Sequence, residues 1–114
     1  MGREKVRFRK YQKIAQKFCN NSTHAKHKMA AVIIRGGAII AKAANKGIWG
    51  EHAEKRALQS ANDPRAFKGG IIIIARSNNK MSKPCEECFN LIKSAGIKKI
   101  IYLDWEGDLV IEKV

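Results

Sequence analysis

The sequence predicts an α/β fold with three layers, α-β-α, around a five-stranded mixed sheet whose last two strands are antiparallel. Three observations carry this prediction: strand-like apolar segments alternate with helical patterns, a Gly36-Gly37 pair joins two such segments, and only a short polar turn separates the last two. A strand, helix and strand in succession favour parallel neighbours with a right-handed crossover. A short turn leaves no room for a crossover helix and favours an antiparallel pair.

The first element is a basic amphipathic helix from about Arg9 to Cys19. Its apolar residues recur at helical spacing and are Tyr11, Ile14, Ala15 and Phe18. Lysines lie on the other side of the helix. Cys19 ends this stripe and is expected in the core, where free cysteines are common.

The remaining elements follow in order. Residues 29–47 predict two strands about the tight Gly36-Gly37 turn. A helix follows at 51–61, and the continuously apolar segment 69–77 is typical of a strand covered on both faces. Pro84 near the start and Gly96 at the end bracket a helix over residues 82–96. A strand at 97–104, a turn at 105–108 and a short strand at 109–114 complete the chain.

The chain has the size and composition of a single globular domain over residues 1–114. It has 45% hydrophobic residues in short, interrupted runs, which argues against a disordered chain. Its longest apolar run, residues 71–75, cannot cross a bilayer, so we expect no membrane partner. No apolar signal segment follows the basic first residues, so we expect an intracellular, cytoplasmic protein. An odd cysteine count, three, argues against a disulfide framework.

Positive charge is concentrated in the first quarter of the chain. The net charge is +13, and residues 1–28 hold nine Lys or Arg against one acid, Glu4. This bias suits a polyanionic partner such as nucleic acid or a nucleotide phosphate. The alternative is that the sixteen lysines, beside abundant isoleucine and asparagine, reflect a biased genome composition rather than a binding face.

Four residues in two short motifs predict a metal site. Cys85 and Cys88 lie three apart at the start of one expected helix, so both sulfurs project from one face. His52 and Glu54 lie at the start of another. If both helices begin at the same end of adjacent parallel units, one imidazole and two thiolates converge on one Zn²⁺ ion and leave its fourth position for water.

Glu54 favours a catalytic over a structural site. A carboxylate beside a metal-bound water can accept its proton and pass protons to a substrate. A structural site usually closes with a fourth Cys or His, and no unassigned Cys/His pair motif is left in the sequence. The alternatives are a redox dithiol or a structural zinc clip.

The segments "HAE" at 52–54 and "PCEEC" at 84–88, each after a strand and opening a helix, resemble the zinc-dependent cytidine/deoxycytidylate deaminase superfamily. The resemblance covers nearly the whole chain and implies the cytidine deaminase-like fold. It implies a hydrolase that removes an exocyclic amine, with one Zn²⁺ per chain. It assigns His52, Cys85 and Cys88 as zinc ligands and Glu54 as the proton shuttle.

The resemblance also implies positions that touch the substrate. The base would lie against the backbone near Ala53 and Lys83, and Asn45 matches a position where relatives place a polar residue on the sugar. For Asn45, a turn asparagine is an equal alternative. Related polynucleotide deaminases read a flanking base near the end of the fourth strand, where Tyr102 and Trp105 lie.

Several loop residues bear on the choice of substrate. His24 and His27 precede the first strand and Trp49 precedes the zinc histidine, where basic and aromatic groups can hold phosphate and stack on bases. For Tyr102 the alternative is a core residue, and for both tryptophans it is an apolar lid or a subunit contact.

Together these observations favour deamination of cytosine to uracil in single-stranded DNA or RNA. The first alternative is a free nucleotide deaminase of the dCMP or cytidine type. The others are an adenosine deaminase acting on transfer RNA and a non-catalytic, zinc-stabilised nucleic-acid-binding module. The expected partner is therefore a cytosine nucleotide or a single strand, and a homo-oligomer stays open.

Overall fold

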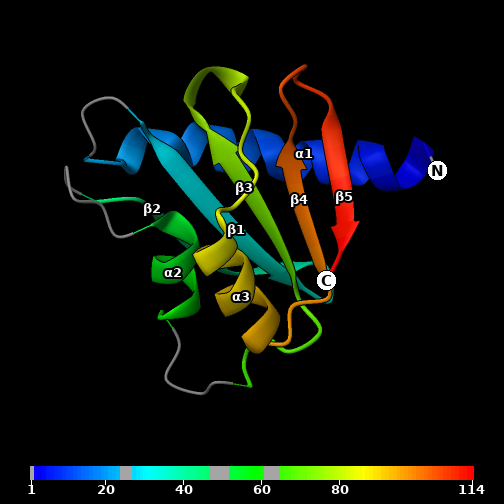
Figure 1. Cartoon of the computed structure of the whole chain (residues 1–114). Helices are drawn as coiled ribbons and strands as arrows, with labels where there is room; N and C mark the ends of the chain where they lie inside the picture. The colour runs from blue at the N-terminus through cyan, green and yellow to red at the C-terminus, as the bar shows by residue number, and fades with distance from the viewer. Residues whose placement is uncertain (1, 24–26, 47–51, 61–64) are drawn as a thin grey trace.

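A computed structural model describes residues 2–23, 27–46, 52–60 and 65–114 of the chain (Figure 1). The elements in chain order are α1 (Gly2–Phe18), the 3-10 turn η1 (Cys19–Asn21), β1 (Met29–Arg35), β2 (Ala38–Ala44), α2 (Ala53–Leu58), β3 (Ile71–Arg76), the 3-10 turn η2 (Ser77–Asn79), α3 (Glu86–Ser94), β4 (Lys99–Leu103) and β5 (Leu109–Lys113).

The five strands form one mixed sheet in the order β2-β1-β3-β4-β5. β3 and β4 are parallel and every other neighbouring pair is antiparallel, including β4 with β5. The predicted sheet is therefore confirmed. Gly36 and Gly37 both have positive φ, 59° and 80°, which is the backbone that a two-residue hairpin turn requires.

Helices cover both faces of the sheet, which gives the three predicted layers. α1 crosses one face, and α2 and α3 lie side by side on the other (Figure 1). Alternate residues of the central strands enter the two cores: Val32, Ile34 and Ile73 pack toward α1, and Ile33, Ile72 and Ile74 pack toward α2 and α3. Cover on both faces explains why β3 is apolar from Ile71 to Ala75, before it ends at Arg76.

α1 begins at Gly2, well before the predicted start at Arg9. Phe8 is 1% exposed and continues the apolar stripe toward the sheet, while Lys99 Nζ bonds Glu4 Oε1 at 2.7 Å. The sequence did not predict the part of α1 before Arg9, because Val6 and Phe8 alternate with basic residues and such alternation is typical of a strand. No helix in the described ranges is both long and apolar enough to cross a membrane.

Two helix boundaries near the expected site also differ from prediction. α2 ends at Leu58 rather than near Ala61, and α3 begins at Glu86. Pro84 is therefore not in the first turn of α3, because Cys85 is the N-cap residue with extended backbone (φ −68°, ψ 167°). This places one cysteine just before the helix and the other inside its first turn.

Candidate metal centre

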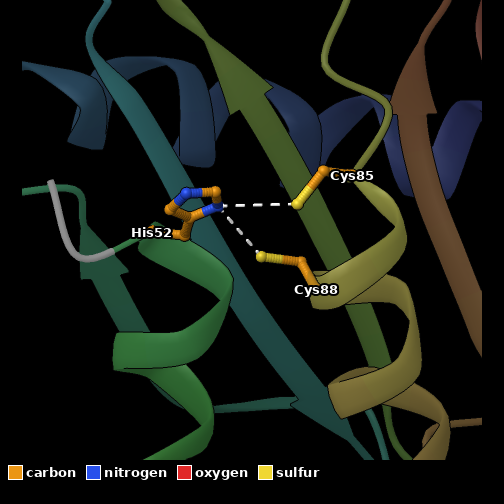
Figure 2. A group of neighbouring side chains, drawn as sticks. All are labelled: His52, Cys85 and Cys88. Atoms are coloured by element: carbon orange, nitrogen blue, oxygen red, sulfur yellow. Dashed lines mark hydrogen bonds between the residues drawn. The ribbon is translucent and has the colours of Figure 1, made fainter.

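His52, Cys85 and Cys88 come together at the starts of α2 and α3. His52 is the N-cap residue of α2, and Cys85 is the N-cap residue of α3. The Nδ1 atom of His52 lies 3.1 Å from Cys88 Sγ and 3.7 Å from Cys85 Sγ (Figure 2). All three ligand atoms lie within 4.8 Å of one another.

The topology of the sheet explains this convergence. β2 and β3 are each antiparallel to β1, which lies between them, so both run in the same direction. The helices that follow them therefore begin at the same end of the sheet and on the same face. The expectation of two adjacent parallel units was wrong in one detail, because β1 separates β2 from β3, yet the helix starts still meet.

The three side chains fit a zinc ion. Tetrahedral zinc with ordinary bond lengths separates an imidazole nitrogen from a thiolate sulfur by about 3.6 Å. The two nitrogen–sulfur distances, 3.1 and 3.7 Å, lie on either side of this value. Two sulfurs and one imidazole are a donor set that zinc accepts, and three protein ligands leave one tetrahedral position for a small molecule.

Glu54 lies in the first turn of α2, two residues after His52, and is 2% exposed. Its Oε1 atom is buried and has no hydrogen-bond partner among the described residues. A buried carboxylate oxygen without a partner is costly, so such an atom marks a place where something other than protein is bound. The position beside the three ligands supports the fit of a metal and its water.

Burial and the nearby Glu54 both affect the pKa of the Cys88 thiol. Burial, and next the negative charge of Glu54, raise the pKa of the Cys88 thiol far above its usual value. In the protein alone these two effects therefore favour the neutral thiol. A bound divalent cation supplies the opposite charge that stabilises the thiolate.

Ala53 and Lys83, whose backbone is expected to lie near the base, differ in exposure. Ala53 is fully buried at the start of α2, while Lys83 is exposed two residues before Cys85. The backbone N–H of Lys83 donates to Met81 Sδ at 3.1 Å. Their contact with a base stays a prediction.

The Asn45 side chain joins the end of β2 to the segment before β1. It is 7% exposed, and its Oδ1 accepts bonds from the Ser22 hydroxyl and, at 2.9 Å, from the Met29 N–H. Its Nδ2 donates to the His27 carbonyl at 2.6 Å. These bonds favour the turn-asparagine alternative over a sugar contact, although one N–H of the amide has no partner in the part of the chain that the structure describes.

Tyr102 in β4 and Trp105 in the turn after β4 differ in exposure. Tyr102 is 7% exposed in the core on the α3 side, and its hydroxyl donates to Glu112 Oε2 at 3.2 Å. This favours the core alternative for Tyr102. Trp105 is 83% exposed in the β4–β5 turn, between the acids Asp104 and Glu106 and close to Asp108.

The residues predicted to border the pocket are only partly placed. His24 and Trp49 lie outside the described residues. His27 is exposed, and its Nδ1 lies 2.6 Å from Arg76 Nη2. A depression of about 500 Å³ lies at the opposite end of the sheet, beside Gly36 and Lys98, so surface shape alone does not point to the metal centre.

Ser82 is a residue of this region that the sequence did not single out. It is 1% exposed and is hydrogen-bonded to both β3 and β4 three residues before Cys85. Its position next to the Pro84-Cys85 pair was a signal, but a serine in a polar segment usually indicates only a turn.

Comparisons with known proteins agree with this geometry. A family model described as "Cytidine and deoxycytidylate deaminase zinc-binding region" matches residues 6–104. A comparison with curated protein sequences finds no match.

Solved structures share the fold at low sequence identity. The dCMP deaminase of cyanophage S-TIM5 in apo form has a TM-score of 0.70 at 22% identity, covering 87% of this chain and 82% of that one. The cytidine deaminase of Burkholderia pseudomallei has a TM-score of 0.70 at 16% identity, covering 90% and 88%. A diaminohydroxyphosphoribosylaminopyrimidine deaminase/5-amino-6-(5-phosphoribosylamino)uracil reductase of Thermotoga maritima has a TM-score of 0.68 at 22% identity, covering 85% of this chain and 29% of that one.

Proposed function

Because the chain belongs to the cytidine and deoxycytidylate deaminase family of zinc-dependent hydrolytic deaminases, we propose that it converts cytosine to uracil in a free nucleotide of the deoxycytidylate type. We assign this activity to residues 1–114 acting as one domain. The observation that carries the proposal is the convergence of His52, Cys85 and Cys88 beside the buried carboxyl group of Glu54.

The proposed chemistry is an addition of water to C4 of cytosine followed by loss of ammonia. His52, Cys85 and Cys88 would hold the zinc ion, which would supply Lewis acidity and lower the pKa of a water beside it. Glu54 would take one proton from the attacking water and pass it to ring atom N3. It would then move the proton of the resulting C4 hydroxyl group to the amine, so that ammonia leaves as the C4 carbonyl forms. The buried Oε1 atom supports this role, because it has no hydrogen-bond partner among the described residues and is free to accept a proton.

Two observations favour a free nucleotide over a polynucleotide. Trp105, the exposed aromatic residue expected to stack on a flanking base, lies among Asp104, Glu106 and Asp108, whose charges repel a phosphate backbone. Tyr102 is buried and its hydroxyl is bonded to Glu112. In addition, the cyanophage dCMP deaminase has been solved in complex with dCMP and dUMP, at a TM-score of 0.66 to this chain.

Cytosine in single-stranded DNA or RNA is the second candidate. It is favoured by the outward side of α1, where Lys10, Lys13 and Lys17 are exposed without an acidic neighbour on that side in the described part of the helix. Such a row of cations suits phosphates. However, α1 lies on the face of the sheet opposite to α2 and α3 (Figure 1), so a strand bound there must also pass around the sheet to reach the metal centre.

A substrate panel tests the proposal. Zinc-loaded protein is offered dCMP, cytidine, a cytosine-containing single-stranded DNA, its RNA counterpart and adenine-containing oligonucleotides, and uracil or hypoxanthine formation is followed. We expect turnover of dCMP that is lost in Glu54→Gln. Turnover of oligonucleotides without turnover of dCMP would replace the proposal with the second candidate. Zinc binding with no turnover of any compound would contradict catalysis and leave a binding module.

A further inference from the structure

We propose that Ser82 is a positioning residue that fixes the Cys85 side of the metal centre, an inference that rests on the proposed zinc site but not on the choice of substrate. Ser82 does not touch the ligand atoms. It acts through the three-residue segment that joins it to Cys85. The argument starts from a gap in the sheet.

β3 and β4 separate at the end nearest the metal centre. Their parallel ladder runs only from Ile71↔Lys99 to Ile73↔Ile101, although β3 continues to Arg76 and β4 to Leu103. Beyond the ladder, the facing backbone groups of the two strands need other partners, because buried N–H and C=O groups are almost always paired. A gap of this kind at the carboxyl ends of parallel strands is where α/β proteins place their sites.

Ser82 fills this gap with three hydrogen bonds. Its hydroxyl donates to the Ile74 carbonyl at 2.7 Å and accepts from the Leu103 N–H at 3.0 Å. Its own N–H donates to the Leu103 carbonyl at 2.9 Å. One buried residue therefore ties the segment before Cys85 to both separated strands.

The Ile74 carbonyl also links this segment to the other face of the sheet. It accepts a second bond, of 3.2 Å, from Gln12 Nε2 on α1, and the Gln12 side chain is 5% exposed. Ser82 is thus held directly to β3 and β4, and to α1 through the shared Ile74 carbonyl. Such multiple anchoring restrains a loop that has no secondary structure of its own.

The segment from Ser82 to Cys85 is short and stiff. It contains the buried Pro84, whose ring restricts its own φ and the conformation of Lys83. Cys85 is the N-cap residue and precedes the first helical residue, so helix packing does not hold it as it holds Cys88, which is buried in α3. A shift of Ser82 therefore moves Cys85 Sγ relative to His52 and Cys88.

The test compares Ser82→Ala with four other variants by zinc affinity and by the visible spectrum of the cobalt-substituted protein. Zinc affinity is measured by competition with a chromophoric chelator. We expect Ser82→Ala to bind zinc at least about 10-fold more weakly, the effect typical of residues that orient metal ligands, and to change the cobalt–thiolate bands. Ser82→Thr, which keeps the hydroxyl, should retain the affinity and the spectrum.

Two controls separate positioning from a general loss of stability. Ser60→Ala removes a hydroxyl that likewise donates to a backbone carbonyl, Ala57 O at 2.7 Å, away from the ligands. Phe8→Ala destabilises the protein from the opposite face of the sheet. Both should bind zinc like the wild type under conditions where they are folded.

The inference is overturned if folded Ser82→Ala binds zinc within about twofold of the wild type with an unchanged cobalt spectrum, even if its melting temperature falls. If Ser82→Ala does not fold, the isosteric variants Ser82→Thr and Ser82→Val are compared, because they differ only in the hydroxyl group. Equal zinc affinities of these two variants overturn the inference. Neither readout involves substrate. Loss of the proposed deamination with the zinc effect intact would therefore contradict the function and not the role of Ser82.

Discussion

At the scale of single residues, Glu54 is a buried acid with one oxygen that no described residue satisfies. An apolar residue at such a position would avoid the cost of removing a carboxylate from water. Proteins therefore keep a buried, unpaired acid where it has a function. Cys88, a candidate metal ligand, lies close enough for the charge of Glu54 to raise the pKa of its thiol. A proton shuttle accounts for both the burial of Glu54 and the unpaired Oε1 atom.

The variant Glu54→Gln tests this role. Glutamine keeps the shape but cannot accept a proton, so we expect kcat to fall by a factor of about 10² to 10⁴ while zinc content stays the same. Glu87→Gln is the control, since Glu87 is an exposed acid in the first turn of α3. Activity of Glu54→Gln close to that of the wild type would remove Glu54 from the mechanism.

Cys19 is a buried thiol outside the metal centre. It is 1% exposed, as the sequence predicted, and its Sγ donates to the Ala75 carbonyl at 3.7 Å. Burial raises the pKa of the Cys19 thiol from 9.0 to about 11. In the unfolded chain the thiol loses its proton near 9, so between these values the unfolded state binds fewer protons than the folded state.

The sign of this difference predicts a loss of stability in alkali. The contribution of the neutral thiol is complete below pH 9 and is lost as the pH rises to about 11. The wild type should lose about 2 to 3 kcal/mol more than Cys19→Ala over this interval, since one pKa unit corresponds to about 1.4 kcal/mol. Urea unfolding at several pH values measures the difference. Parallel pH profiles of the two proteins would contradict the burial of this thiol as its cause.

At the scale of elements, the strands and the hairpin agree closely with the prediction, because the glycine pair and the apolar runs are compatible with few other secondary structures. The helix boundaries were less predictable. α1 extends to Gly2 since Phe8 finds a place in the core, which is a tertiary contact that local spacing does not reveal. α3 starts at Glu86, and a proline two residues earlier does not specify whether the helix begins before or after Cys85.

The packing of Phe8 tests the amino-terminal half of α1. Phe8→Ala should cost about 3 to 5 kcal/mol of unfolding free energy, the usual cost of deleting a fully buried phenyl ring. Val6→Ala, at a position 70% exposed, should change stability by about 0.5 kcal/mol or less. Denaturant unfolding measures both values. An equal, small effect of the two substitutions would indicate that the start of α1 does not pack on the sheet.

At the scale of the whole molecule, the metal centre is a product of topology. His52 and the cysteines lie far apart in sequence and meet because β2 and β3 run in the same direction on either side of β1. The motif and its ligands were predictable from residue types and spacing. The support from Ser82, Gln12 and the Ile74 carbonyl was not, because it depends on where the β3–β4 ladder ends.

The substrate is the part of the function that the sequence left most open. It favoured a polynucleotide on the basis of net charge and loop aromatics. In the structure Tyr102 is buried, and the acids on either side of Trp105 in the sequence, Asp104 and Glu106, gather with Asp108 in one cluster. Composition counts charges without placing them. The cations of α1 are on one face of the sheet, and the candidate metal centre is on the other.

X-ray absorption at the zinc edge of the metal-loaded protein tests the central claim most directly. The account predicts one zinc per chain, with two sulfur neighbours at about 2.3 Å and two nitrogen or oxygen neighbours at about 2.0 to 2.1 Å. Cys19→Ala should leave this spectrum unchanged, and Cys88→Ser should remove one sulfur. A wild-type spectrum with three sulfurs, with one sulfur or with none would contradict a centre built from His52, Cys85 and Cys88.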